Sequence, residues 1–339
     1  MNVIFAGDFA QLPPPTDARL YGRIDGEKCS KSSVGQDIIF GKLLWLSVQT
    51  VVFLTQQHWQ MGDNNGRFVE LLSRLREGRC NNRDNDLLHL HVLSLLDVNE
   101  DPGWRAVPII VATNAAKDAL NECMAKQFAL NTGQELHWYY AIDHISTKNT
   151  NSGGVIEDKV LIEQLQCLHS GKTKQCLGKI PLVLGMPVLV AHNFDVGGRI
   201  TNGTRGTIKK ITYTVDVHGI QHLMSVIIHC PEVDQTPMQN LPAGYYPIIA
   251  NSVTLKFEHP YNKSKWTILC TQVSIVPAFA MTAHRVQRMT LDHVIVDLES
   301  CSGTESLYVM LSRVHSLNGV TVLCFFLKKR ITCSLSKDM

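Results

Sequence analysis

Apolar runs and turn residues follow one another along the chain in the order expected of an α/β protein. The first run, Val3-Ile4-Phe5, leads into Gly7-Asp8 and then into Pro13-Pro14, the first two of three consecutive prolines. Continuous apolar runs closed by turn residues are typical of strands that are buried on both faces of a parallel sheet. We therefore predict a buried strand over residues 2–5 and, because proline fixes the backbone, a stiff loop after it.

Two segments repeat apolar residues with the period of a helix. The first covers residues 67–78 and stops at a glycine, and the second begins at Asn114 and ends before Gly133, just after a strand predicted over 107–112. Apolar positions three or four residues apart indicate a helix that packs one face against a core. These positions are Phe68, Leu71, Leu72 and Leu75 in the first helix and Leu120, Met124 and Phe128 in the second.

The rest of the pattern divides into a polar stretch, a β-rich stretch and a return to alternating elements. Residues 131–160 are rich in Asn, Thr and Gly around 147–154, so we expect a long surface connection there. From 182 to 275 short β-patterned runs dominate, and the runs 207–215 and 220–229 predict a hairpin across the turn at 216–219. After Pro277 the order is helix, strand, helix, strand, with strands predicted over 293–298 and 320–323.

Composition is that of a globular protein without a strong electrostatic signature. The 339 residues are long enough for two or three domains, with 45% hydrophobic and 18% charged residues. A net charge of +2 gives no overall footprint for nucleic acid, so any such binding would rest on a local groove. The basic residues Arg199, Arg205, Lys209 and Lys210 are candidates, and the alternative is a solvated face of the hairpin.

The ten cysteines stand singly and do not indicate a metal site. No Cys-x-x-Cys pair and no Cys/His spacing suggests zinc, so free thiols in a reducing compartment are the simple interpretation, and no metal ligand is predicted. Met1 lacks the basic region of a signal peptide, and no apolar run approaches the ~20 residues of a membrane span. We expect a protein of the cytosol or nucleus.

The first turn also offers candidate chemistry. Asp8 and Gln11 follow the carboxyl end of the first predicted strand, where open α/β sheets bind ligands. Gln11 has the amide group needed to hydrogen-bond a phosphate oxygen or an attacking water. The alternative is a Gly-Asp turn with a proline-stiffened loop and no ligand.

Four segments, taken in order, carry a resemblance to a known family. They are Gly7 to Pro14, the turn Asn202-Gly203-Thr204-Arg205-Gly206, the run Ala280 to Asp292, and Tyr308 to Val314 with Ser316-Leu317-Asn318-Gly319 close behind. Together they resemble the petite-integration-frequency (Pif) family of superfamily 1 DNA helicases, in its transposon-type (Helitron-like) branch. The resemblance covers nearly the whole chain.

The resemblance implies a fold. It is an α/β fold, an incomplete tandem RecA-like (P-loop NTPase) helicase core with a small β-barrel insert in the second domain. Residues 1–100 would be the C-terminal remnant of the first RecA-like domain, and 105–180 the first part of the second. Residues 181–275 would be the β-rich insert and 276–332 the remainder of the second domain. We expect 1–100 to be unstable in isolation, because the apolar strand at its start needs neighbouring strands, and 105–330 to fold alone.

The resemblance also implies an activity and its residues. Members of the family use ATP and Mg²⁺ to move 5′→3′ on single-stranded or forked DNA, and the family favours the nucleus over the mitochondrion or cytosol. On that basis Gln11 senses the γ-phosphate and Arg313 acts as an arginine finger, whereas the alternative for Arg313 is a surface salt bridge. The residues implied for nucleotide are Asp8, Gln11, Gln287 and Arg313, and those implied for DNA are Thr282, His284, Arg285, Asn202 and Arg205.

Departures from the family pattern are as informative as the matches. No Gly-x-x-x-x-Gly-Lys-Ser/Thr loop (Walker A) follows a strand, and no Asp-Glu (Walker B) follows it. Gly171-Lys172-Thr173 is a decoy, because Gln166 stands where the first glycine belongs and a helical pattern over 161–168 precedes it. Trp59 stands where the family has a phosphate-binding arginine, and Arg288 where it has glycine.

These departures leave three functions open. The first is the C-terminal portion of a Pif-type helicase that is unable to hydrolyse ATP alone. The second is a single-stranded DNA-binding module, and the third is an inert transposon-derived relic. A metabolic α/β enzyme is a distant fourth, because the sequence has no Gly-x-Gly-x-x-Gly loop and no nucleophile elbow. The oligomeric state and the pathway served, whether repair, recombination, telomere maintenance or transposition, do not follow from the sequence.

Overall fold

The computed structural model describes residues 3–14, 19–22, 32–55, 60, 66–95, 107–145, 154–233, 240–258, 263–287 and 289–332. The chain forms two compact units. Unit 1 combines Met1–Ala112 with Ala283–Met339, and unit 2 is Thr113–Thr282. Among the described residues no helix has both the length and the apolar character needed to cross a membrane.

Unit 1 is built on parallel strands that come from distant parts of the chain. β1 pairs in parallel with β12 through Ile109–Ile295 and Ile110–Val296, and β12 pairs in parallel with β13. Parallel strands cannot be joined by a tight turn, so helices and long connections link them. The helices of unit 1 are α2 (Ser33–Leu46), α3 (Gly66–Arg76), α4 (Asn82–His89), α7 (Ala283–Val286) and α8 (Thr304–Leu311); its strands are β1 (Ile109–Val111), β12 (Val294–Val296) and β13 (Val320–Val322); short 3₁₀ turns cover Leu93–Leu95, Leu317–Gly319 and Lys328–Arg330.

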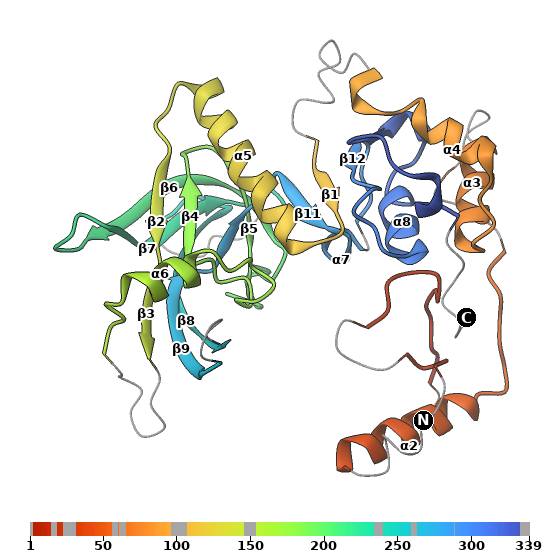
Figure 1. Cartoon of the computed structure of the whole chain (residues 1–339), viewed down its shortest axis with the longest axis horizontal. Coiled ribbons are helices and arrows are strands. Elements are labelled where there is room, and N and C mark those ends of the chain that lie inside the picture. Colours follow the sequence, from red (N-terminus) through yellow and green to blue (C-terminus); the bar gives the residue numbers. More distant parts are fainter. Residues whose placement is uncertain are drawn as a thin grey trace. The chain divides into compact units, whose positions relative to one another are not determined.

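Helices α3 and α8 pack against each other (Figure 1). The predicted helix over 67–78 is confirmed as α3, and its four predicted core residues are all buried. Gly78 follows it with φ +67°, a left-handed conformation that favours glycine and ends the helix. α4 begins with a capping box, in which Asn81 and Asp84 each accept a hydrogen bond from the other's backbone N–H.

The strand predicted at the start of the chain is wrong. Residues 3–7 have no regular secondary structure, and Ile4 is 92% exposed. A parallel strand is stable only when a neighbour accepts and donates its backbone hydrogen bonds, and no described residue pairs with this segment. Aromatic contacts hold it to α2 instead, since the ring centroids of Phe5 and Phe9 lie 5.4 and 5.8 Å from that of Trp45.

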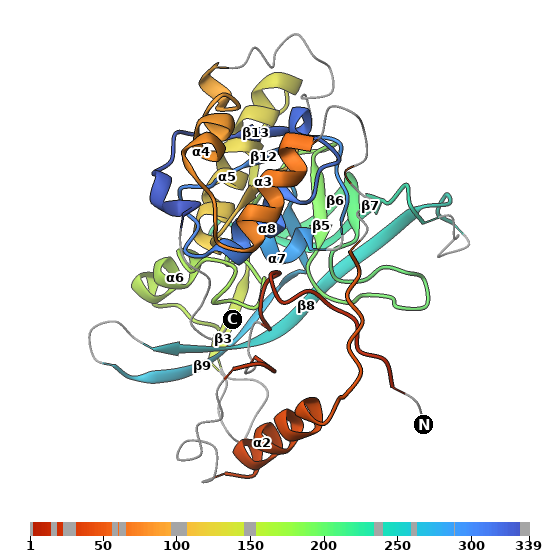
Figure 2. The same cartoon turned by 90° about the vertical axis from the view of Figure 1, so that its right-hand side faces the viewer.

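Unit 2 is dominated by an antiparallel sheet of seven strands in the order β10-β5-β6-β7-β8-β9-β3. In Figure 2, β9 runs beside β8, with which it pairs from Ala250 to Glu258, and β3 pairs with the other edge of β9. Most strands of this sheet come from the β-rich stretch predicted over 182–275, whereas β3 comes from outside it. The strands of unit 2 are β2 (His137–Tyr140), β3 (Ile142–Ile145), β4 (Lys179–Leu182), β5 (Pro187–Val190), β6 (Arg205–Val215), β7 (Gln221–His229), β8 (Tyr245–Glu258), β9 (Lys265–Val273), β10 (Ile275–Pro277) and β11 (Ala280–Thr282); its helices are α5 (Asn114–Thr132) and α6 (Lys159–Gln166).

The predicted hairpin is confirmed as β6 and β7. Its turn contains Gly219 with φ +79°, and Asp216 Oδ1 accepts hydrogen bonds from the backbone N–H groups of His218 and Ile220. The pairing register shifts between Ile208 and Lys210, which marks an irregularity of the bulge type. The shift allows consecutive residues, Lys209 and Lys210, both to be exposed.

The expected surface connection over 131–160 is wrong in its described part. Residues 137–145 form β2 and β3, of which β2 pairs with β4 and β3 pairs with β9. Tyr139 of β2 is buried, and its ring centroid lies 5.4 Å from that of Tyr213. These strands are stabilised by partners more than 40 residues away, with Tyr139 paired to Ile180 and Asp143 to Cys270, and a local pattern carries no signal for such partners.

The helix predicted from Asn114 is confirmed as α5, which ends at Gly133 with φ +63°. The apolar residues predicted to face the core, Leu120, Met124 and Phe128, are only half-buried. The residue directly after each of them is the buried one. Asn121 is among the buried residues because it is satisfied: its amide donates to the carbonyl of Ala280 at 3.1 Å and accepts from the N–H of Ala280 at 2.7 Å. The buried residues of α5 are Lys117, Asn121, Ala125 and Ala129.

We predict that Asp84→Ala lowers the free energy of unfolding of unit 1 by about 3 kcal/mol, because it removes both a helix cap and a buried ion pair. Asp84 is 1% exposed, and Arg74 Nη2 lies 2.7 Å from its Oδ1 while Arg74 Nε lies 3.0 Å from its Oδ2. The measurement is denaturant unfolding followed by circular dichroism. Glu70→Ala is the matched control, because its contact with the same arginine is exposed and should contribute less than about 0.5 kcal/mol. Equal losses for the two variants would contradict the prediction.

Candidate functional site

Two residues that are 276 positions apart meet in unit 1. Gln11 stands in a tight turn, where its backbone N–H donates to the carbonyl of Asp8 at 3.1 Å. Gln287 follows α7 directly. The Nε2 group of Gln287 donates a hydrogen bond of 3.1 Å to Oε1 of Gln11. The structure therefore brings together two of the residues that the sequence motifs singled out.

Asp8 is held in place by a charge that the sequence analysis missed. Arg76, the last residue of α3, lies with its Nη2 3.0 Å from Asp8 Oδ1, and the same oxygen accepts from the N–H of Ala10 at 3.0 Å. Burial raises the pKa of Tyr308 on α8, and the negative charge of Asp8 raises it further. The positive charges of Arg76 and Arg313 lower the same pKa. The sequence indicated only that Arg76 is one of two arginines in the last turn of this helix.

Arg313 follows α8 and is held by uncharged oxygen atoms. Its Nε donates to the carbonyl of Val309 at 2.9 Å and its Nη2 to Oγ of Ser312 at 2.7 Å. Nη1 lies 3.4 Å from the carbonyl of Met289. In the described part of the chain no carboxylate pairs with it, so the surface salt bridge is not what the structure contains. Burial lowers the pKa of Arg313 from its usual value, which indicates a guanidinium that has lost part of its water without gaining a counter-charge.

The loop that carries Arg313 is fixed from several sides. The side-chain amide of Gln60 lies 3.4 Å from the carbonyl oxygens of both Ser312 and Val314, and the carbonyl of Arg313 itself accepts from the N–H of Leu291 at 2.8 Å. Gly319 is required behind the loop, because a Cβ there would overlap the carbonyl of Asp292. Trp59 and Arg288, the two departures from the family pattern, lie outside the described residues.

The residues expected at DNA are divided between the two units. Thr282 ends β11 in unit 2 and is half-buried, while His284 is exposed and Arg285 half-buried on α7 of unit 1. Burial lowers the pKa of Arg285. The structure thus gives these neighbouring residues different degrees of access to a ligand.

Asn202 and Arg205 belong to a compact turn that opens β6 in unit 2. Gly203 has φ +103°, and Thr201 and Thr204 hydrogen-bond each other through backbone and side chain at 3.0 Å in both cases. Asn202 is exposed at the tip, with its N–H donating to Oδ1 of Asn193 at 2.9 Å. Arg205 begins the same strand that carries the exposed pair Lys209 and Lys210, so basic side chains follow one strand from its first residue to the register shift.

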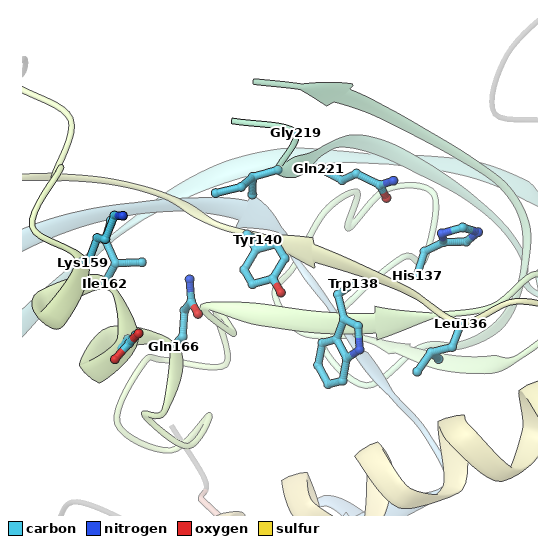
Figure 3. Close-up of a pocket in the computed structure, with 11 residues that line it drawn as sticks. Leu136, His137, Trp138, Tyr140, Lys159, Ile162, Gln166, Gly219 and Gln221 are labelled. Carbon is cyan, nitrogen blue, oxygen red and sulfur yellow. The ribbon is translucent and has the colours of Figure 1, made fainter. Parts of the chain in front are cut away.

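An open groove of about 560 Å³ in unit 2 was not foreseen from the sequence. Figure 3 shows Tyr140 between the side chains of α6 on one side and Trp138 and His137 on the other, with the β6–β7 turn along the edge. Lys179 Nζ lies 5.1 Å from the centre of the Trp138 indole, a cation–π distance. The lining residues are Leu136, His137, Trp138, Tyr140, Lys159, Ile162, Glu163, Gln166, Gly219, Ile220 and Gln221.

The Gly171-Lys172-Thr173 segment is not built as a phosphate loop. It follows helix α6 rather than a strand, as the sequence predicted. Ser170, fully buried beside it, receives a hydrogen bond of 2.7 Å from Lys117 Nζ and donates its own backbone N–H to Asp118 at 2.7 Å. The segment is therefore anchored to α5 by a packed polar network.

Asp8, in the same turn as Gln11, is already paired and is not free to hold a Mg²⁺ ion. Magnesium takes hard oxygen ligands, usually one or two carboxylates with several waters. Asp8 is the carboxylate closest in sequence to Gln11, and it already forms an ion pair with Arg76. No group of three or more His, Cys, Asp or Glu side chains in the described part of the chain is arranged to hold a metal.

Comparison with known proteins gives a consistent relationship in sequence. No family profile matches the chain. It is 24% identical over 337 residues to the ATP-dependent DNA helicase PIF1 of Homo sapiens, covering 96% of this chain and 41% of the human protein. It is 26% identical over 329 residues to the ATP-dependent DNA helicase Pif1 of Bdellovibrio bacteriovorus, covering 95% of this chain and 58% of that protein. The chain therefore spans only part of the length of these relatives.

The same relationship holds for the fold. The Pif1 helicase of Candida albicans matches with a TM-score of 0.56 at 21% identity, covering 98% of this chain and 65% of that one. A Bacteroides Pif1 helicase in complex with ADP-AlF3 and single-stranded DNA matches with a TM-score of 0.61 at 17% identity, covering 96% of this chain and 62% of that one. The predicted α/β class with RecA-like architecture is confirmed. In sequence and in fold, the chain is similar to Pif1 helicases.

Proposed function

We propose that this chain supplies part of the nucleotide cleft and a DNA-binding surface of an ATP-dependent DNA helicase acting 5′→3′ on single-stranded or forked DNA. The observation that carries the proposal is the hydrogen bond between Gln11 and Gln287 in unit 1. Asp8, in the same turn as Gln11, raises the pKa of Tyr308, and Arg313 lowers it. Helicase relatives named for ATP and DNA, and one solved with ADP-AlF3 and single-stranded DNA, support it.

In this proposal the side chains have separate tasks. Gln11 hydrogen-bonds the terminal phosphate or the attacking water, and Gln287 fixes the orientation of its amide. The hydrogen-bond acceptors of Arg313 are uncharged oxygens, so they hold its guanidinium in place but do not neutralise its positive charge. This charge can stabilise the negative charge that develops on a transferring phosphoryl group. Arg76 keeps Asp8, and with it the turn of Gln11, in position.

The finer division of labour is also a proposal. Residues 1–100 and 276–332 would belong to RecA-like domains, 105–180 would begin the second of them, and 181–275 would be the β-rich insert that contacts DNA. Because no Walker A or Walker B motif stands in the sequence, we propose that this chain does not hydrolyse ATP by itself. We place the activity in the nucleus, as the family resemblance implies.

We predict that Arg313→Ala lowers ATP turnover about 10³-fold when the chain is supplied with the Walker A and Walker B segment of a Pif1 relative, because charge stabilisation in the transition state is lost. Turnover is measured by phosphate release with single-stranded DNA present. Arg79→Ala is the matched control, since Arg79 is 75% exposed and pairs only with Glu77 in the described structure. Unchanged turnover in Arg313→Ala would remove this residue from the site.

A single-stranded DNA-binding module is the second candidate function, and two observations in unit 2 favour it. The groove offers Trp138 and Tyr140, two residues apart on one strand, as stacking surfaces for bases. The basic side chains along β6 offer contacts to phosphates. This function requires no nucleotide, so DNA affinity that is unaffected by ATP would favour it over the helicase.

We predict that the Lys209→Ala, Lys210→Ala double variant binds single-stranded DNA with a shallower salt dependence, the slope of log K against log salt falling by about 1.4, because two phosphate contacts of about 0.7 each are lost. Fluorescence anisotropy of a labelled oligonucleotide over a salt series measures the slope. Lys126→Ala is the control, because Lys126 is paired with Glu122 on α5 and should leave the slope unchanged. An unchanged slope in the double variant would show that Lys209 and Lys210 do not contact the DNA phosphates.

A further inference from the structure

Two cysteines that are far apart in the sequence have their sulfur atoms side by side. The Sγ atoms of Cys176 and Cys270 lie 3.2 Å apart, and the two residues are 94 positions apart in the chain. Each is 2% exposed. The spacing of cysteines in the sequence gave no indication of this pair.

The pair joins two layers of unit 2. Cys176 stands in the loop after α6, and Cys270 stands in β9, where it is paired with Asp143 of β3. Both cysteines belong to a small core that contains Leu161 and Leu165 of α6 and residues of β8 and β9. The thiol of Cys176 also points toward the carbonyl oxygen of Cys270 at 3.8 Å. Packing on both sides therefore holds the two sulfurs toward each other.

We propose that Cys176 and Cys270 are an oxidisable dithiol that forms an intramolecular disulfide with a peroxide as the oxidant. A disulfide has an S–S distance of about 2.05 Å, so the two sulfurs must approach by only about 1 Å. Side-chain rotation can supply part of such an approach. A small uncharged peroxide suits this site because both sulfurs are buried.

The reaction balances with hydrogen peroxide and two thiols. The sulfur of Cys176 attacks one peroxide oxygen, the O–O bond breaks, and the released hydroxide takes the thiol proton to form water, which leaves a sulfenic acid. The sulfur of Cys270 then attacks the sulfenic sulfur, the S–OH bond breaks, and a second water leaves with the proton of Cys270. The hydrogen bond with Cys176 and burial raise the pKa of Cys270. The same balance holds if the sulfur of Cys270 attacks the peroxide first.

Oxidation would fix one wall of the groove. Ile162 and Gln166 of α6 line the groove, and Cys176 lies at the end of the loop that follows this helix. A bond from that loop to β9 ties α6 to the sheet across 94 positions of the chain. Long closures of this kind stabilise a fold, and we expect the thermal midpoint to rise by about 5 °C or more.

The test is peptide mapping of the whole chain after treatment with hydrogen peroxide, alkylation under denaturing conditions and digestion without reductant. We expect a linked pair of peptides containing Cys176 and Cys270, lighter than their sum by two hydrogens and separated again by reductant. The exposed residues Cys123 and Cys167 report that oxidant reached the protein. Alkylation of both Cys176 and Cys270 while these two are oxidised would overturn the proposal, as would a bond from Cys176 to a different cysteine.

A pair of variants separates the disulfide from a general effect of oxidation. Cys176→Ser should give no linked peptide and no rise in the thermal midpoint. Cys230→Ser is the matched control, because Cys230 is also buried but belongs to a different core cluster of unit 2, and in the described part of the chain its thiol forms no hydrogen bond with another cysteine. It should form the bond at the wild-type rate. Because the linked peptide is sought in the wild-type chain, failure of either variant to fold leaves the test intact.

Discussion

The parallel pairing of β1 with β12 is the interaction on which unit 1 depends. The chain leaves this unit at Ala112 and returns at Ala283, and the pairs Ile109–Ile295 and Ile110–Val296 join the two parts again. The strand β13 extends the same parallel ladder. Backbone hydrogen bonds in a buried sheet have no water to replace them, so the register is strongly fixed.

This pairing brings segments from residues 283–339 into contact with segments from residues 1–112 within unit 1. The segment after α7 reaches the first turn, where Gln287 meets Gln11, and α8 contacts α3. The loop of Arg313 is tied to residue 291 just ahead of β12, and Leu291 and Val314 form a parallel bridge. Gln11 from the start of the chain and Gln287 and Arg313 from its last part therefore belong to one compact unit.

Charge is arranged unevenly in this unit. Asp8 is neutralised by Arg76, whereas Arg313 contacts only uncharged oxygens in the described structure. A half-buried guanidinium with a lowered pKa and without a counter-charge favours the approach of an anion, since the anion restores the interaction that burial removed. This asymmetry distinguishes Arg313 from Arg74, whose charge is satisfied by the buried Asp84.

Local pattern predicted much of the fold, and tertiary partners account for the failures. Helices α3 and α5 and the hairpin of β6 and β7 followed from periodicity and turn chemistry, which act over a few residues. The apolar run 3–5 read as a buried strand but has no paired neighbour, and β2 and β3 were missed because their partners lie far along the chain.

The candidate site divides in the same way. The family motifs pointed to Gln11, Gln287 and Arg313 individually, and only the structure pairs the two glutamines. Arg76 and Gln60 were missed because their roles come from contacts with residues 68 and 252 positions away, respectively. Sequence spacing likewise gave no sign that Cys176 and Cys270 touch, since 94 positions separate them.

The most direct test of the central claim is a double-mutant cycle on the two glutamines. The free energy of unfolding is measured by denaturant titration for the parent, Gln11→Ala, Gln287→Ala and the double variant. If the amides form the hydrogen bond of 3.1 Å, the coupling free energy should be about 0.5–1.5 kcal/mol. Losses that add within about 0.3 kcal/mol would mean that the two residues do not meet, and the proposed nucleotide site would lose its basis.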